Sequence, residues 1–122
     1  MLTVLVADDE FAVLEVLSMA LEGEGHRVLK AGDGADALRI LSTQPCDVVL
    51  VDENMPVMNG HQLLAAMKAD EKLATLPVLL MAESWGRPLP QVDGAALVLG
   101  KPLRLAELFI HVERLGKARR TP

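Results

Sequence analysis

The 122-residue chain is poor in aromatic residues, with two Phe, one Trp and no Tyr. Its core must therefore be aliphatic, and aromatic stacking on single-stranded nucleic acid has little to work with. Cysteine is equally scarce: the single Cys46 cannot form an internal disulfide, which fits a reducing compartment. The apolar runs are far shorter than the ~20 residues that span a bilayer, and the first residues lack the basic start of a signal peptide. We expect a cytoplasmic protein without membrane insertion.

Positive charge is also in deficit, since 12 Lys and Arg face 17 Asp and Glu, for a net charge of −5. This balance argues against direct binding of nucleic acid or of an anionic membrane by bulk charge. The hydrophobic share of 51% with 24% charged residues excludes an intrinsically disordered chain. The length suits one compact domain.

Five apolar runs of strand length recur along the chain, at residues 2–7, 27–31, 48–51, 78–81 and 96–99. They are mostly continuous rather than alternating, which is typical of strands buried on both faces of a parallel sheet. The segments between them show helical spacing around residues 11–21, 37–41 and 63–67, and another follows at 105–112. Pro88 and Pro90 interrupt the segment before the fifth run, so we expect any helix there to be short or irregular. The pattern predicts a single α/β domain with a doubly wound parallel sheet.

Charged residues stand where three of these strands end. Asp8 and Asp9 follow the first run, Asp52 follows the third and Lys101 follows the fifth. In such sheets ligands bind beyond the carboxyl ends of the strands. Clustered carboxylates repel one another unless a cation joins them, and a hard divalent ion such as Mg²⁺ prefers oxygen ligands. An aspartate held beside a metal and a lysine can act as a nucleophile toward a phosphoryl group.

Each of these residues also has an ordinary interpretation. Asp8 or Asp9 alone is more often a helix N-cap than a metal ligand, and a lone Asp52 before a loop is usually a turn residue. The joint pattern favours a site, because every one of these residues falls just past a predicted strand.

The run from Val49 to Gly60 resembles the phosphoacceptor strand and loop of bacterial response-regulator receiver domains, with their D-x-x-M-P-x-M-x-G pattern. Asp8-Asp9 resembles the acidic pair of that chemotaxis-type family, and Lys101-Pro102 resembles its lysine followed by a cis-linked proline. The resemblance implies a flavodoxin-like (βα)5 fold with strand order 2-1-3-4-5. It covers nearly the whole chain, so we expect a receiver domain over residues 2–116 and a basic C-terminal tail over 117–122.

The resemblance also implies roles for individual residues. Asp52 would be the phosphoacceptor, and Lys101 would contact the phosphoryl group. Mg²⁺ would be bound by Asp9, Asp52 and the backbone carbonyl of Asn54, with Asp8 acting through water. The implied partners are a histidine kinase or phosphotransfer protein and a downstream protein or output domain, none of which the sequence names.

Three positions depart from the family pattern. Ala82 stands at the hydroxyl position at the end of the fourth strand, Glu83 at the small position after it, and Val98 at the position of the switch aromatic. Ala82 cannot donate a hydrogen bond to a phosphoryl oxygen, and Val98 has no ring to reorient. The switch is therefore expected to be degenerate at both ends.

The sequence thus favours a signalling domain that accepts a phosphoryl group in a phosphorelay and is not an enzyme beyond its own phosphorylation and dephosphorylation. The alternative is a pseudo-receiver, a protein-interaction module that works without phosphorylation. A haloacid dehalogenase-type phosphatase ranks third, because Asp8-Asp9-Glu10 does not supply the Asp-x-Asp of that class. No output domain fits within these residues, so we expect a stand-alone receiver or one excised from a longer protein.

Overall fold

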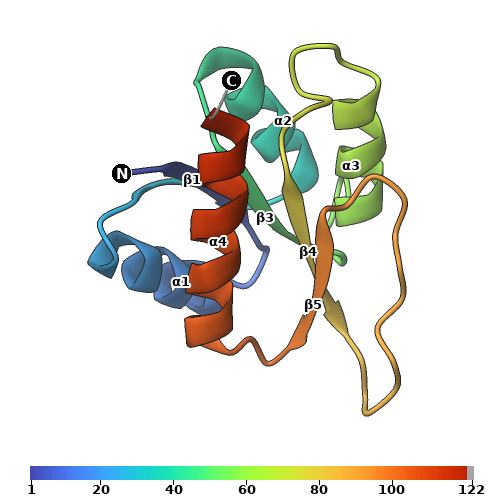
Figure 1. Cartoon of the computed structure of the whole chain (residues 1–122). Coiled ribbons are helices and arrows are strands. Elements are labelled where there is room, and N and C mark those ends of the chain that lie inside the picture. The colour runs from blue at the N-terminus through green and yellow to red at the C-terminus, as the bar shows by residue number, and fades with distance from the viewer. Residues whose placement is uncertain (121–122) are drawn as a thin grey trace.

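A computed structural model of the chain describes residues 1–120. Within them, five parallel strands form one sheet in the order β2-β1-β3-β4-β5, accompanied by four helices (Figure 1). The strands are β1 (Thr3–Ala7), β2 (Arg27–Ala31), β3 (Val48–Asp52), β4 (Val78–Glu83) and β5 (Leu97–Lys101). The helices are α1 (Phe11–Gly23), α2 (Gly34–Thr43), α3 (Gly60–Lys68) and α4 (Leu105–Arg120). The predicted doubly wound fold and its strand order are confirmed.

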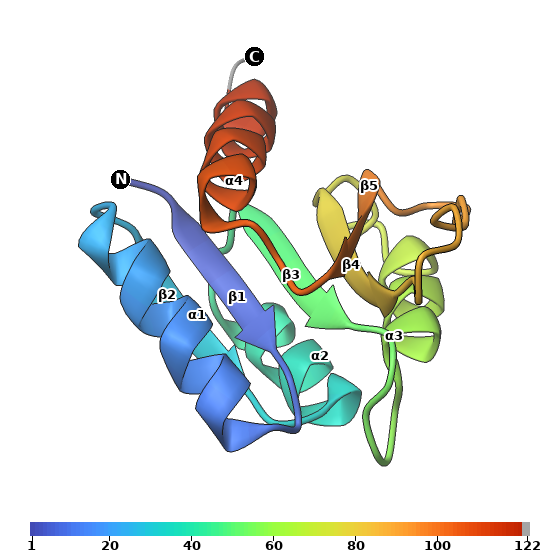
Figure 2. The ribbon, with the colours of Figure 1, turned by 90° about the horizontal axis from the view of Figure 1, so that it is seen from below.

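The sheet is covered on both faces, α1 and α4 on one and α2 and α3 on the other (Figure 2). Alternate residues of the central strands pack into the hydrophobic layers on the two faces of the sheet. In β3, Leu50 packs toward α1 and α4, and Val51 packs toward α2 and α3. Every residue of β3 is buried, which is why its sequence is apolar without alternation until Asp52. No helix among residues 1–120 is both long and apolar enough to cross a membrane.

The helix starts on the side of α2 and α3 are fixed by side-chain caps. Asp33 accepts a hydrogen bond from the Asp36 backbone N–H at 2.8 Å, which caps α2. Asn59 and Gln62 form a reciprocal capping box at the start of α3. The N-cap of α1 is Glu10, whose side chain makes no capping bond. The carboxylates of Asp8 and Asp9 are thus not the N-cap of α1.

The segment between β4 and β5 contains no helix over residues 84–96, a stronger departure than the short or irregular helix expected there. It opens with a tight turn in which the Arg87 N–H bonds to the Ser84 carbonyl, and Trp85 and Gly86 both have positive φ (50° and 77°). Pro88 and Pro90 then keep the chain out of a helix, because each lacks a backbone N–H and disfavours helical backbone at the residue before it. Instead Leu89 lies over Gly100 of β5, where a Cβ would sit 3.3 Å from the Leu89 side chain.

The basic residues expected to form a tail are helical as far as Arg120 and make the last turn of α4. Arg120 is joined to Asp47 by two hydrogen bonds of 2.9 and 2.7 Å. The sequence suggested a solvated terminus because the acidic partner of Arg120 does not lie near this basic run. That partner, Asp47, is 73 positions earlier in the sequence. Residues 121 and 122 lie outside the described part of the chain.

Candidate functional site

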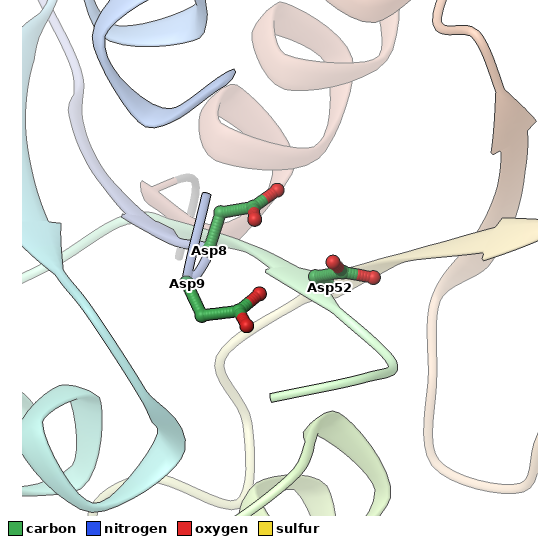
Figure 3. A group of neighbouring side chains, drawn as sticks. All are labelled: Asp8, Asp9 and Asp52. Carbon is green, nitrogen blue, oxygen red and sulfur yellow. The ribbon is translucent and has the colours of Figure 1, made fainter. Parts of the chain in front are cut away.

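The sheet brings Asp8, Asp9 and Asp52 together at its carboxyl edge. Ala7 and Val51 are partners in the β1–β3 register, so the residues that follow them, Asp8 and Asp52, emerge side by side. One carboxylate oxygen from each of Asp8, Asp9 and Asp52 can be chosen so that all three lie within 4.8 Å of one another. Figure 3 shows the side chains of Asp8, Asp9 and Asp52 close together where β1 and β3 end. The predicted convergence of acidic side chains is thus present.

The three carboxylates differ in their surroundings. Asp8 and Asp52 are almost wholly buried, with 1% and 2% of their surfaces exposed, whereas Asp9 is open to solvent. Asp8 Oδ1 accepts a hydrogen bond from the Glu10 N–H at 2.9 Å, but the buried Oδ2 has no partner among the described residues. Burial, and then the charge of Asp52, raises the pKa of Asp8 above its usual value. The site therefore holds more negative charge than its own hydrogen bonds satisfy.

Lys101 supplies positive charge to this cluster. Its Nζ donates to Asp52 Oδ2 at 2.9 Å, across the width of β4. Burial alone lowers the pKa of Lys101, but the hydrogen bond and the charge of Asp52 outweigh it, so the net shift is upward and the ammonium form is favoured. Lys101 precedes Pro102 through a cis peptide bond, as the resemblance implied.

The loop after Asp52 is anchored closely to the sheet and to α2. The Asn54 N–H donates to Asp52 Oδ1 at 3.3 Å, and the Gly34 N–H at the start of α2 donates to the Met58 carbonyl at 2.9 Å. Gly60 needs its bare Cα, because a Cβ there would lie 2.5 Å from the Asp52 carbonyl oxygen. The loop is thereby held against the end of β3, with Asn54 beside Asp52.

The donor set fits Mg²⁺ in its chemistry. Oxygen atoms from carboxylates are the ligands that this ion uses, and it is usually held by few of them with water completing its shell. The buried, unpartnered Oδ2 of Asp8 is a polar atom that lacks the partner it needs in a low-dielectric environment. The cluster of Asp8, Asp9 and Asp52 is thus consistent with a site for a divalent ion.

The structure also places the three residues that depart from the family pattern, Ala82, Glu83 and Val98. Ala82 is buried at the end of β4, where its methyl group offers no hydrogen-bond donor. Glu83, the last residue of β4, is exposed and stands opposite Lys101 in the β4–β5 register. Val98 packs against the core on the side of α2 and α3, as do Val92 and Ala95 of the irregular segment.

A groove of about 650 Å³ opens next to the cluster, between α1, the end of β4 and the connection from β5 to α4. Most of its lining is apolar, including Val16 of α1 and Trp85. Its charged lining residues are Glu10, Glu83 and Lys101. Sequence reasoning missed Glu10 as part of the site, although it directly follows the acidic pair at the end of β1.

A second feature that the sequence did not reveal is the backbone at Val57. Its φ is 68°, and the Met58 N–H bonds to the Pro56 carbonyl at 2.7 Å. A three-residue turn with a positive central φ is a rare and strained γ-turn, and for a β-branched residue the strain is greater. Glycine or asparagine is the usual signal for such a conformation, and neither stands here.

Comparison with known proteins identifies the family. The family model of the response regulator receiver domain matches residues 4–113. Transcriptional regulatory protein PrrA of Mycobacterium tuberculosis is 36% identical over 117 residues, which cover 95% of this chain and 50% of PrrA. Protein PilH of Pseudomonas aeruginosa is 32% identical over 110 residues, 84% of this chain and 88% of PilH. The chain thus spans about half the length of PrrA and most of PilH.

A solved structure agrees with these sequence matches. The receiver domain of sensor histidine kinase PA1611 from Pseudomonas aeruginosa PAO1, with a magnesium ion coordinated in its active site cleft, matches with a TM-score of 0.84 and 25% identity. The alignment covers 95% of this chain and 98% of that one. The chain belongs to the response-regulator receiver domain family, whose function is phosphorelay signalling. The comparisons confirm the family and the phosphorelay role predicted from the sequence.

Proposed function

We propose that this receiver domain accepts a phosphoryl group on Asp52. The observation that carries the proposal is the 2.9 Å contact between Lys101 Nζ and Asp52 Oδ2, next to the carboxylates of Asp8 and Asp9. Asp52 is buried at a strand end with its second oxygen near the Asn54 N–H. A carboxylate fixed in this way is oriented for attack, and Lys101 lies where it can meet the charge of an incoming anion.

Mg²⁺ completes the proposed site. Asp9, Asp52 and the backbone carbonyl of Asn54 would hold it, with Asp8 acting through water. When bound, the ion neutralises charge on the oxygens of the transferred group. The magnesium ion in the receiver domain of PA1611, a structure 25% identical to this chain, supports the assignment.

In the proposed transfer an oxygen of Asp52 forms a bond to phosphorus while the phosphorus–nitrogen bond of a phosphohistidine breaks. The leaving imidazole nitrogen keeps the electron pair of that bond. Lys101 stays protonated and faces the phosphoryl oxygens. The domain would act as a phosphoacceptor rather than as an enzyme with an independent substrate.

The proposed partners are a histidine kinase or phosphotransfer protein and a downstream protein or output domain, meeting in the cytoplasm. Helix α1 and the loop at residues 54–60 are the expected contact surfaces. In support, α1 presents Phe11, Val16 and Met19 to solvent, with 75%, 59% and 68% exposure. Apolar side chains exposed on one helix next to a site are typical of protein contact surfaces.

The second candidate is a pseudo-receiver that binds partners without phosphorylation. Ala82 and Val98 favour it, together with the lack of a helix over residues 84–96, because the usual output steps are missing there. This candidate predicts partner binding that is independent of Asp52 chemistry.

Intact-mass measurement after incubation with phosphoramidate and Mg²⁺ separates the two candidates. We expect the wild-type protein to gain one phosphoryl group and Asp52→Asn to gain none. Glu71→Gln, an exposed acid in the connection that leads to the start of β4, is the matched control and should be phosphorylated like the wild type. Phosphate gain by Asp52→Asn would show that the acceptor is another residue.

A further inference from the structure

Glu83 places an acidic side chain at the mouth of the site. It ends β4, directly opposite Lys101 of β5 in the sheet register, and is exposed. Glu10 approaches the same mouth from the start of α1, since Glu10, Glu83 and Lys101 all line the groove beside the carboxylate cluster. Two carboxylates from separate elements therefore flank the lysine that is expected to face an incoming phosphoryl group.

Within the described part of the chain, neither carboxylate is held in a salt bridge, although the charge of Glu10 acts on Lys101. Among residues 1–120, the side chains of Glu10 and Glu83 have no hydrogen bond or ion pair. Lys101, the cation that shares the groove with them, is bonded to Asp52 at 2.9 Å. The charge of Glu83 is thus free to act on any ion that approaches the groove.

The neighbouring position offers no compensation. Ala82 is buried and carries only a methyl group, so the last two residues of β4 present a negative charge and no hydroxyl. The hydroxyl of Ser84, which follows β4 and lines the groove, is uncharged and does not cancel the charge of Glu83. Negative charge at the opening of the groove lowers the local concentration of anions and raises that of cations. The effect grows with the charge of the approaching group.

We propose that Glu83, assisted by Glu10, selects phosphodonors by charge. This inference rests on phosphorylation of Asp52 as proposed above. Glu83 disfavours small, strongly anionic donors and favours a phosphohistidine whose protein surroundings are basic, since Lys or Arg side chains there would meet the two glutamates. Glu83 is a specificity-determining residue in this scheme, because it acts on the approach of the donor and not on the bond that breaks.

Two small donors of different charge test the inference. Near neutral pH acetyl phosphate is a dianion and phosphoramidate a monoanion, so a charge effect must be larger for acetyl phosphate. For Glu83→Gln, which keeps the size of the side chain, we expect the phosphorylation rate with acetyl phosphate to rise about 3- to 10-fold. The rate with phosphoramidate should rise only by the square root of that gain, about 2- to 3-fold, because the electrostatic free energy is proportional to the charge of the donor. Glu83→Lys should raise the acetyl phosphate rate further. Glu71→Gln is the remote control and should change neither rate.

Salt dependence provides a second readout. The gain of Glu83→Gln with acetyl phosphate should shrink as salt rises, because the screening length falls from about 10 Å at 0.1 M to about 3 Å at 1 M. An equal gain with both donors, or a gain that salt leaves unchanged, would show a steric effect and overturn the inference. Unchanged rates for Glu83→Gln, with Asp52 still phosphorylated, would overturn it while leaving the proposed function intact. Failure of every variant to gain phosphate from either donor would instead overturn the proposed function, and this inference with it.

Discussion

Arg120 in the last turn of α4 donates two hydrogen bonds to Asp47, which lies 73 positions earlier, immediately before β3. Asp47 also accepts the backbone N–H of Thr3 at 2.8 Å, so its carboxylate joins the beginnings of two strands to the end of the last helix. Gly116 allows the same helix to lie close to β1, since a Cβ there would be 2.5 Å from the Leu2 side chain. The edge of the sheet opposite the site is thereby closed by α4.

Removing the Asp47 carboxylate should therefore destabilise the fold. Asp47→Ala leaves the Thr3 N–H without its side-chain acceptor and Arg120 without its partner, so we expect a loss of about 1–3 kcal/mol in the free energy of unfolding near neutral pH. Chemical denaturation measures it. Arg39→Ala breaks only an exposed pair with Asp36 and should be close to neutral.

The same carboxylate predicts a pH dependence. Burial opposes the charge of Asp47, but the hydrogen bonds from Arg120 and the Thr3 N–H outweigh it and lower its pKa. A group with a lowered folded pKa contributes stability above its unfolded pKa, about 3.9, and loses it as pH falls through the folded value. The stability difference between the wild type and Asp47→Asn should be constant above about pH 5 and shrink below about pH 4. A constant difference through that acid range would contradict the assignment.

Mg²⁺ binding should depend on the three carboxylates at the strand ends. Asp52→Ala or Asp9→Asn removes one oxygen ligand and one charge, so we expect the affinity to fall about tenfold in a calorimetric titration. Lys101→Ala removes a cation and no proposed ligand, and should retain binding. The metal site would be misassigned if Asp52→Ala bound Mg²⁺ with the affinity of the wild type.

Relief of the strained turn at Val57 should stabilise the protein. Asn tolerates positive φ far better than a β-branched residue, and the Val57 side chain is 82% exposed, so little packing is lost. We expect Val57→Asn to raise the free energy of unfolding by about 0.5–1.5 kcal/mol, measured by denaturation. Val57→Ile keeps the β-branch and serves as the control that should show no gain. A lower stability for Val57→Asn would mean that the γ-turn is not strained.

Much of the fold followed from local patterns. The run 27–31 was predicted with the bounds that the structure gives β2, and β3 differs from its predicted run only by including Asp52. Such agreement is expected because strands buried on both faces must be apolar throughout. The meeting of Asp8, Asp9 and Asp52 followed from topology, since parallel strands place their carboxyl ends at one edge.

Other features could not be predicted because they depend on contacts between distant residues. Pro88 and Pro90 indicated that a helix would be disturbed, but not that Leu89 would lie over Gly100 in its place. The basic run at residues 117–120 gave no sign of Asp47, since nothing local links the two. The difference in burial between Asp8 and Asp9 likewise reflects which way each faces once β1 has ended.

The final prediction concerns where a bound phosphoryl mimic changes the molecule. Ala82 cannot donate a hydrogen bond to the mimic, and a missing charge-assisted bond is worth about 1.5–3 kcal/mol. Moving a two-state equilibrium from 1:99 to 99:1 takes about 5.5 kcal/mol, so this is a large part of the driving force. The segment over residues 84–96 also lacks the helix that would carry a rearrangement, and Val98 has no ring to reorient.

We therefore expect beryllofluoride with Mg²⁺ to shift the amide resonances of the loop at residues 54–60 and of the start of α1, with small changes from Trp85 to Leu99. The loop should respond because the Asn54 N–H already bonds to Asp52, and the Met58 carbonyl is tied to Gly34 of α2. Spectra of Asp52→Ala with the same additions provide the control and should show no such shifts. Large changes from Ala82 through Lys101 that spare the loop would mean that the signal leaves by β4 and β5 despite Ala82 and Val98.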